Sequence, residues 1–112
     1  MIRRLFILNF FLHAYFACGQ APFSHHTPQN IYAESRELYD RAMYSPAAEG
    51  FQNVISKVDS ESDLAEQSSF FYVLCGIKLM NRDAGDQVLK FLNEYPTSAR
   101  RKELILGIAE YS

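Results

Sequence analysis

The fold of this chain is decided by one apolar stretch, Phe70-Phe71-Tyr72-Val73-Leu74-Cys75-Gly76-Ile77-Lys78-Leu79-Met80, which closes the longer segment 62–80. A membrane span needs about 18 or more apolar residues, and the charged Lys78 and Arg82 end this run well short of that length. Strands usually run about 4–8 residues, so a run of this length favours a helix. A helix that is apolar on nearly every side must be covered on both flanks. We therefore expect the rest of the chain to supply helices that cover it.

The beginning of the chain has the pattern of a secretory signal peptide over residues 1–19. The basic residues Arg3 and Arg4 precede an apolar stretch that ends in small residues suited to signal peptidase. We place the cleavage between Gly19 and Gln20. Removal of this leader leaves 9 basic against 13 acidic residues, so the mature chain carries a net charge of −4. That balance provides no basic footprint for nucleic acid, and we expect an exported protein.

The two cysteines have different expected fates. Cys18 lies at the end of the leader, and lipidation at this position is the alternative to its loss with the leader. Ala17 suits the position before a lipidated cysteine, but the two aromatic residues before Ala17 do not. Cys75 has no partner for an intramolecular disulfide in the mature chain. Its apolar neighbours favour a buried small hydrophobic residue over a reactive thiol.

No pattern typical of catalysis is present in the sequence. Residues 20–27 are expected to form a flexible linker that contains His25-His26, but no carboxylate or cysteine at ligand spacing supports a metal site there. The chain has no phosphate-binding loop, zinc spacing or nucleophile elbow. Histidine is absent after His26, which removes the commonest general base. We expect no enzyme activity, no cofactor, no metal and no small-molecule substrate.

Apolar spacing and capping residues predict five helices in sequence order. Thr27, followed by proline, is typical of a helix start, and Ser45 marks a second such start. Ser60 and Asp63 have the spacing of a capping box that begins the central helix. Pro96 ends the fourth helix. The predicted helices span residues 28–44, 45–58, 62–80, 84–95 and 99–111.

The apolar spacing also repeats along the chain. An offset of 37 residues pairs Ala47 with Ala84, and it further pairs Phe51 with Val88, Val54 with Phe91, Ile55 with Leu92, and Val58 with Tyr95. An offset of 34 residues pairs Phe71 with Ile105, Leu74 with Ile108, and Cys75 with Ala109. A helix–turn–helix unit that recurs about every 34 residues predicts an all-α fold, an α-solenoid of antiparallel helix pairs. An ordinary five-helix bundle is the alternative.

These repeats resemble the tetratricopeptide repeat (TPR) family. The residues that carry the resemblance are an aromatic at the turn, a small residue, a second aromatic and an aliphatic: Tyr44, Ala47, Phe51 and Val54. Ala84, Val88 and Pro96 take the corresponding places in the second unit, whereas Ala42 replaces a common glycine and Asp59 a proline. The segment 90–98 is similar to repeat endings of exported bacterial scaffolds, including outer-membrane assembly lipoproteins and periplasmic partners of the Tol–Pal system. The resemblance covers residues 31–111.

The resemblance implies a non-catalytic protein–protein interaction scaffold in the periplasm or at the outer membrane. In the family, the first helix of each pair lines a groove that binds a peptide or a partner's helix. The residues expected to face such a groove are Tyr32, Arg36, Ser69, Val73, Arg100 and Arg101. Of the places where some family members grip a terminal carboxylate, only Arg36 could serve. We therefore do not expect that variant of the groove.

The domain is expected over residues 28–112, as about two and a half repeats with the last one incomplete. The last helix would then leave one side bare, and the residues expected at this exposed apolar end are Leu104, Ile105 and Ile108. Burial of such side chains is worth about 1.5–3 kcal/mol each. One alternative to a peptide-binding scaffold is a small secreted helical protein that self-associates through this last helix. A second alternative, which depends on Cys18, is a lipidated outer-membrane subunit.

Overall fold

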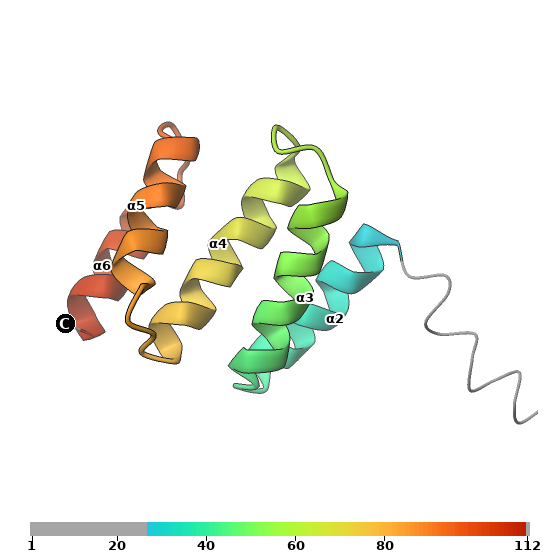
Figure 1. Ribbon diagram of the computed structural model, residues 1–112, viewed down its shortest axis with the longest axis horizontal. Coiled ribbons are helices and arrows are strands. Elements are labelled where there is room, and N and C mark those ends of the chain that lie inside the picture. Colours follow the sequence, from blue (N-terminus) through green and yellow to red (C-terminus); the bar gives the residue numbers. More distant parts are fainter. Residues whose placement is uncertain (1–26, 112) are drawn as a thin grey trace, which may run out of the picture.

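The computed structural model describes residues 27–111, and this part of the chain is all α-helical, without a strand. The leader and all but the last residue of the linker lie outside the described residues. Figure 1 shows the helices running alternately up and down. Their bounds are α2 Pro28–Asp40, α3 Tyr44–Lys57, α4 Asp63–Lys78, α5 Ala84–Glu94 and α6 Arg101–Tyr111. Among the described residues, no helix has both the length and the apolar character that crossing a bilayer requires.

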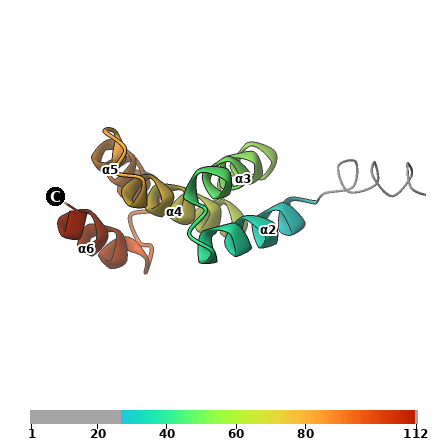
Figure 2. The same ribbon diagram turned by 90° about the horizontal axis from the view of Figure 1, so that it is seen from below.

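Helix α4 occupies the middle of the molecule and contacts all four other helices. Figure 2 shows α3 and α5 on one side of α4 and α2 and α6 on the other. Helices α2 and α3 form a hairpin whose Cα atoms all lie more than 8 Å from those of α5 and α6. The prediction of a central helix covered on both flanks is therefore confirmed. Seven of its residues are buried: Ala65, Ser68, Phe70, Val73, Leu74, Cys75 and Ile77.

The core consists of two clusters, one on each side of α4. Phe70, Val73 and Ile77 face α5 and α6, where they pack with residues such as Phe91 and Leu104. Cys75 faces the α2–α3 hairpin and packs with Phe51 and Ala47 of α3. The ring of Phe71 lies against both clusters, stacked at 5.5 Å from the ring of Phe51.

The offset of 37 residues between α3 and α5 is matched by burial. Ala47 and Ala84 are both buried, and so are the pairs Phe51 with Val88 and Val54 with Phe91. The offset of 34 residues between α4 and α6 is matched less well, because Cys75 is fully buried while Ala109 is exposed. Helix α6 is packed on one side only within the described part of the chain.

Only some of the helix caps predicted from the sequence are present in the structure. The Thr27 cap is confirmed, since its hydroxyl accepts a hydrogen bond of 3.2 Å from the amide of Asn30. The predicted Ser60 cap is wrong, because the hydroxyl that caps α4 belongs to Ser62, which accepts from the amide of Ala65 at 3.1 Å. The predicted Ser45 cap is wrong as well, because α3 already begins at Tyr44.

The boundary between α2 and α3 follows from a tight helix-ending turn. Helix α2 ends at Asp40 and not at Tyr44, because Ala42 adopts a left-handed conformation with φ 61°. The amide of Met43 then donates to the carbonyl of Leu38 at 2.9 Å, which closes a Schellman motif. Helix α4 ends in the same way, with Met80 at φ 57°.

Close contact between α2 and α3 depends on two small residues. The hydroxyl of Ser35 donates to the carbonyl of Ile31 at 2.7 Å and is buried against Gly50 of α3. A methyl group added to Gly50 would overlap the Ser35 hydroxyl and come within 3.0 Å of its Cβ. The two helix backbones can therefore approach this closely only without a side chain at position 50.

Candidate functional site

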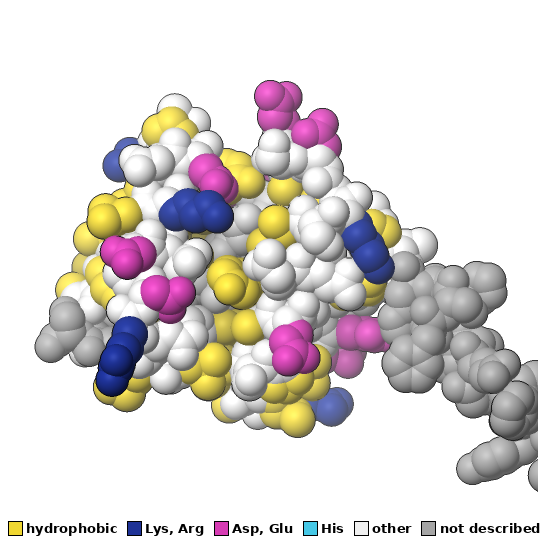
Figure 3. All heavy atoms as spheres, in the orientation of Figure 1, with side chains coloured by type: hydrophobic (Ala, Val, Ile, Leu, Met, Phe, Trp, Pro, Cys, Tyr) yellow, Lys and Arg dark blue, Asp and Glu magenta, His cyan; other side chains and the backbone are white. Residues whose placement is uncertain are grey.

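An open cleft lies between α3 and α5, with α4 as its floor. Its volume is about 750 Å³. The cleft exists because α3 and α5 both pack on α4 while their Cα atoms stay more than 8 Å apart. Figure 3 shows hydrophobic side chains in the hollow between these two helices, with charged groups near its rim. The lining residues are Gln52, Ile55, Ser60, Glu61, Ala65, Ser69, Tyr72, Val73, Gln87, Lys90, Phe91, Glu94 and Tyr95.

The floor of the cleft is built from residues spaced along one side of α4. Ala65 and Ser69 are small residues of the floor, and Tyr72 is its large residue. Ile55 of α3 and Phe91 of α5 add apolar surface from the two walls. This combination can hold an aliphatic side chain of a partner, because apolar area removed from water contributes about 25 cal/mol per Å².

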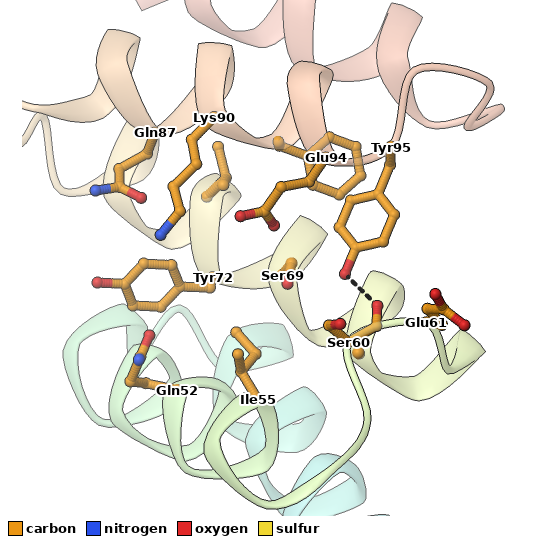
Figure 4. Close-up of a pocket in the computed structure, with 13 residues that line it drawn as sticks. Gln52, Ile55, Ser60, Glu61, Ser69, Tyr72, Gln87, Lys90, Glu94 and Tyr95 are labelled. Atoms are coloured by element: carbon orange, nitrogen blue, oxygen red, sulfur yellow. Dashed lines mark hydrogen bonds between the residues drawn. The ribbon is translucent and has the colours of Figure 1, made fainter.

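Polar groups surround this apolar floor. Figure 4 shows Gln52 of α3 and Gln87 of α5 on opposite walls, with Lys90 and Glu94 of α5 also extending into the cleft. Carboxamide side chains both donate and accept hydrogen bonds, so they can pair with the main chain of a bound peptide. An apolar centre with a few polar groups is typical of binding pockets.

One end of the cleft is closed by a single hydrogen bond. The hydroxyl of Tyr95 at the end of α5 donates to the carbonyl of Ser60 at 3.1 Å (Figure 4). This bond connects the α3–α4 loop to α5 across 35 residues of sequence. It therefore sets the distance between the two walls at this end.

A second surface, on the α2 side of α4, holds some of the predicted groove residues. The guanidinium of Arg36 lies 3.9 Å from the ring centroid of Phe71, a cation–π contact. It also forms an ion pair of 3.8 Å with Asp40. The ring of Tyr32 packs edge-on against Phe71, with 6.4 Å between the centroids. The ion pair lies within α2, and the two contacts with Phe71 stabilise the packing of α2 on α4.

The remaining predicted groove residues make contacts around the loop before α6. Arg100 donates to the carboxylate of Glu66 at 3.2 Å, and its guanidinium lies 5.8 Å from the ring centroid of Phe70. Arg101 is exposed and donates to the carbonyl of Pro96 at 2.7 Å. Arg100 therefore ties the α5–α6 loop to α4, and Arg101 stabilises the loop itself.

The structure distributes the six predicted groove residues over more than one surface. Ser69 and Val73 line the cleft, and Val73 is buried with 4% of its surface exposed. Tyr32 and Arg36 lie on the other side of α4, against Phe71. The sequence reasoning missed the cleft-lining Tyr72 and the lining residues of α3 and α5. A usable signal was present in the polar Gln52, Gln87, Lys90 and Glu94, which interrupt the apolar spacing of those helices.

The predicted exposed apolar end needs a correction at Leu104. Leu104 is fully buried, because it packs with Phe91 and the α4 residues of the core. Ile108 is partly buried against the same cluster, and only Ile105, 47% exposed, faces solvent as expected. Leu106 is 61% exposed and was not among the predicted residues.

Two titratable groups are shifted by burial. Burial raises the pKa of the Cys75 thiol from 9.0 to about 11. Burial likewise raises the pKa of Tyr39, and the charge of Lys78 opposes this shift. A buried thiol with a raised pKa is a poor nucleophile. Among residues 27–111, no group of three or more His, Cys, Asp or Glu side chains could hold a metal ion.

Comparisons with known proteins do not assign the chain to a family. No protein-family model, no curated protein and no solved structure matches it.

Proposed function

We propose that this chain is a non-catalytic protein–protein interaction scaffold of the bacterial cell envelope, built as an α-solenoid of TPR-like helix pairs. The observation that carries the proposal is the cleft of about 750 Å³ between α3 and α5. Its apolar floor and facing glutamines suit a short peptide or a partner's helix that inserts an aliphatic side chain. The matched burial of α3 and α5 at an offset of 37 residues supports the repeat architecture.

Export and envelope location rest on the sequence of residues 1–19. Their basic start, apolar stretch and small terminal residues favour a cleaved leader. Mass spectrometry of the protein isolated from a bacterial host tests this part, with a mature start at Gln20 as the expected result. A lipid-modified Cys18 would instead support the anchored outer-membrane subunit, and an uncleaved Met1 start would contradict export.

Selection of peptides from a random phage-displayed library against the full chain tests the binding function. We expect the selected peptides to bind the wild type and to lose binding to Ser69→Trp, because the indole fills the floor of the cleft. Arg36→Gln is the matched control on the other side of α4, and it should bind normally.

Three outcomes of this selection contradict the proposal in different ways. Loss of binding with Arg36→Gln but not with Ser69→Trp would move the site to the α2 side of α4. Equal binding by both variants would exclude both surfaces. A library that yields no binder above background would contradict a peptide-binding scaffold altogether.

Self-association through the last helix is the second candidate function. The observation that favours it is the exposure of Ile105 and Leu106 on α6, at 47% and 61%. Light scattering of the purified protein at micromolar concentration tests it. A dimer that Leu106→Ser converts to a monomer would support self-association, and a wild-type monomer would contradict it.

A further inference from the structure

We propose that one end of the molecule docks on an anionic lipid bilayer. This end is formed by the α2–α3 turn and the α4–α5 turn, which lie at the lower edge of the molecule in Figure 1. We call it the turn patch. It consists of three apolar and three basic residues: Met43, Leu79, Met80, Arg41, Lys78 and Arg82.

The turn patch concentrates exposed apolar side chains. Met43 is 48% exposed, Leu79 41% and Met80 71%, and these are three of the six large hydrophobic residues exposed on the described chain. Hydrophobic side chains are visible along the lower edge of the molecule in Figure 3. None of the three lines the cleft. They project from two turns at one end of the molecule, where they can insert together into the boundary between the headgroups and acyl chains of a bilayer. A protein ligand is more often held in a hollow.

The side chain of Met80 does not match the backbone conformation of its turn. Met80 adopts φ 57°, a left-handed conformation in which glycine is the least strained residue. The equivalent position of the first turn, Ala42, has φ 61°. Because most of its side chain is exposed to solvent, Met80 gains little packing energy to offset this strain. A large, exposed apolar side chain at such a position points to a role outside the fold.

Charge decides what kind of surface the turn patch meets. Arg41, Lys78 and Arg82 are exposed beside the apolar side chains. Two carboxylates are near in sequence. Asp40 pairs with Arg36 at 3.8 Å, whereas Asp83 keeps its charge, because its hydrogen bond of 3.4 Å comes from the neutral amide of Gln87. The three cations of the turn patch still outnumber this one remaining carboxylate.

Apolar side chains flanked by cations match an anionic bilayer, in which acyl chains lie beneath phosphate groups. The acidic balance of the whole chain opposes this docking only weakly. Exposed charges more than about 8 Å away are largely screened at physiological salt.

Membrane docking by the turn patch is independent of peptide binding in the cleft, because the two surfaces share no residue. The cleft would remain open to a partner while the turns contact lipid.

The test uses the mature chain, residues 20–112, which lacks the apolar leader and Cys18, with a polarity-sensitive fluorophore on an introduced cysteine. The native Cys75 is fully buried and is not labelled in the folded protein. Vesicles of equal parts phosphatidylglycerol and phosphatidylcholine are the probe. A label at Met43→Cys should shift to the blue and be quenched by brominated acyl chains. A label at Leu89→Cys, on an equally apolar exposed site of α5, should show neither effect.

Two glycine variants of the Met43→Cys protein separate docking from stability. Met80→Gly relieves the left-handed strain, so its Tm should rise by about 4–8 °C. It also removes an inserting side chain, so more lipid, about tenfold, should be needed for the fluorescence shift. Ala42→Gly relieves the same strain in the other turn without removing a large side chain. It should raise the Tm and leave the lipid dependence unchanged.

The charge part of the proposal is tested by Arg82→Gln, which should raise the lipid requirement about fivefold on anionic vesicles and have no effect on neutral ones. The proposal is overturned if the label at position 43 stays in a polar environment on anionic vesicles. It is also overturned if Met80→Gly requires no more lipid than Ala42→Gly does, or if the labels at positions 43 and 89 respond alike.

Discussion

The close crossing of α2 and α3 makes Gly50→Ala the most informative single substitution in the fold. On helix propensity alone, alanine in a helix interior is more stable than glycine by about 1 kcal/mol. The structure predicts the opposite sign. The new methyl would overlap the Ser35 hydroxyl and lie 3.0 Å from its Cβ, where ordinary carbon contacts are about 3.5–4.0 Å.

The magnitude follows from the two ways in which this overlap can be relieved. Rotation of the Ser35 side chain breaks its hydrogen bond to Ile31 and leaves a buried hydroxyl unsatisfied, which costs about 1–3 kcal/mol. The remaining contact with the Ser35 Cβ forces the helices apart, and overpacking of this kind costs about 1–3 kcal/mol. After the gain in propensity is subtracted, we expect the free energy of unfolding to fall by about 3 kcal/mol.

Urea denaturation followed by circular dichroism measures this change, and two variants control for it. Gly85→Ala on α5 should be neutral or stabilising by up to about 1 kcal/mol, because nothing lies within 4 Å of the added methyl. Ser35→Gly combined with Gly50→Ala moves the side chain from α2 to α3 and removes the overlap, so it should recover most of the lost stability. A Gly50→Ala protein that is as stable as Gly85→Ala would refute the close crossing.

Three further predictions concern the core, the buried thiol and the cleft. Leu104→Ala should lower the free energy of unfolding by about 2–5 kcal/mol, whereas Ile105→Ala should lower it by about 0.5 kcal/mol or less, both by urea denaturation. Since the folded pKa of Cys75 is about 11 and the unfolded value 9.0, stability should fall by about 2–3 kcal/mol as the pH rises from 9 to 11. Cys75→Ala should remove that part of the pH dependence, and an unchanged profile would contradict the buried thiol. Tyr95→Phe should cost about 0.5–1.5 kcal/mol and speed amide exchange in the α3–α4 loop around Ser60, and unaltered exchange would contradict a closed end of the cleft.

The existence of the helices could be predicted from the sequence because their apolar spacing is strong and Thr27 and proline mark a clear start. Their ends were harder to place. Ser60 and Ser62 can both cap a helix, and only the path of the loop selects Ser62. At α3, the left-handed Ala42 shortens the turn so much that the helix begins before Ser45.

The faces of α4 could not be predicted, and this is why the candidate site was only partly found. When a helix is apolar all round, its sequence does not indicate which face packs against which neighbouring helix. Ser69 and Phe71 lie about 200° apart on the helix, so one faces the cleft and the other faces Arg36. The same limit explains Leu104, because it and Ile105 differ by about 100° and only the packing of α6 on α4 and α5 decides which is buried.

The backbone separation between the α2–α3 hairpin and the α5–α6 pair has a mechanical consequence. Within residues 27–111, α4 is the only helix whose Cα atoms come within 8 Å of both pairs, so it is the axis about which the two pairs can rotate relative to each other. A small rocking of either pair about α4 would change the width of the cleft without unfolding any helix. The hydrogen bond from Tyr95 to Ser60 then restrains this motion at one end of the cleft. Rotation of the two helix pairs about α4 could therefore fit the cleft to partners of different width, with the helices themselves left intact.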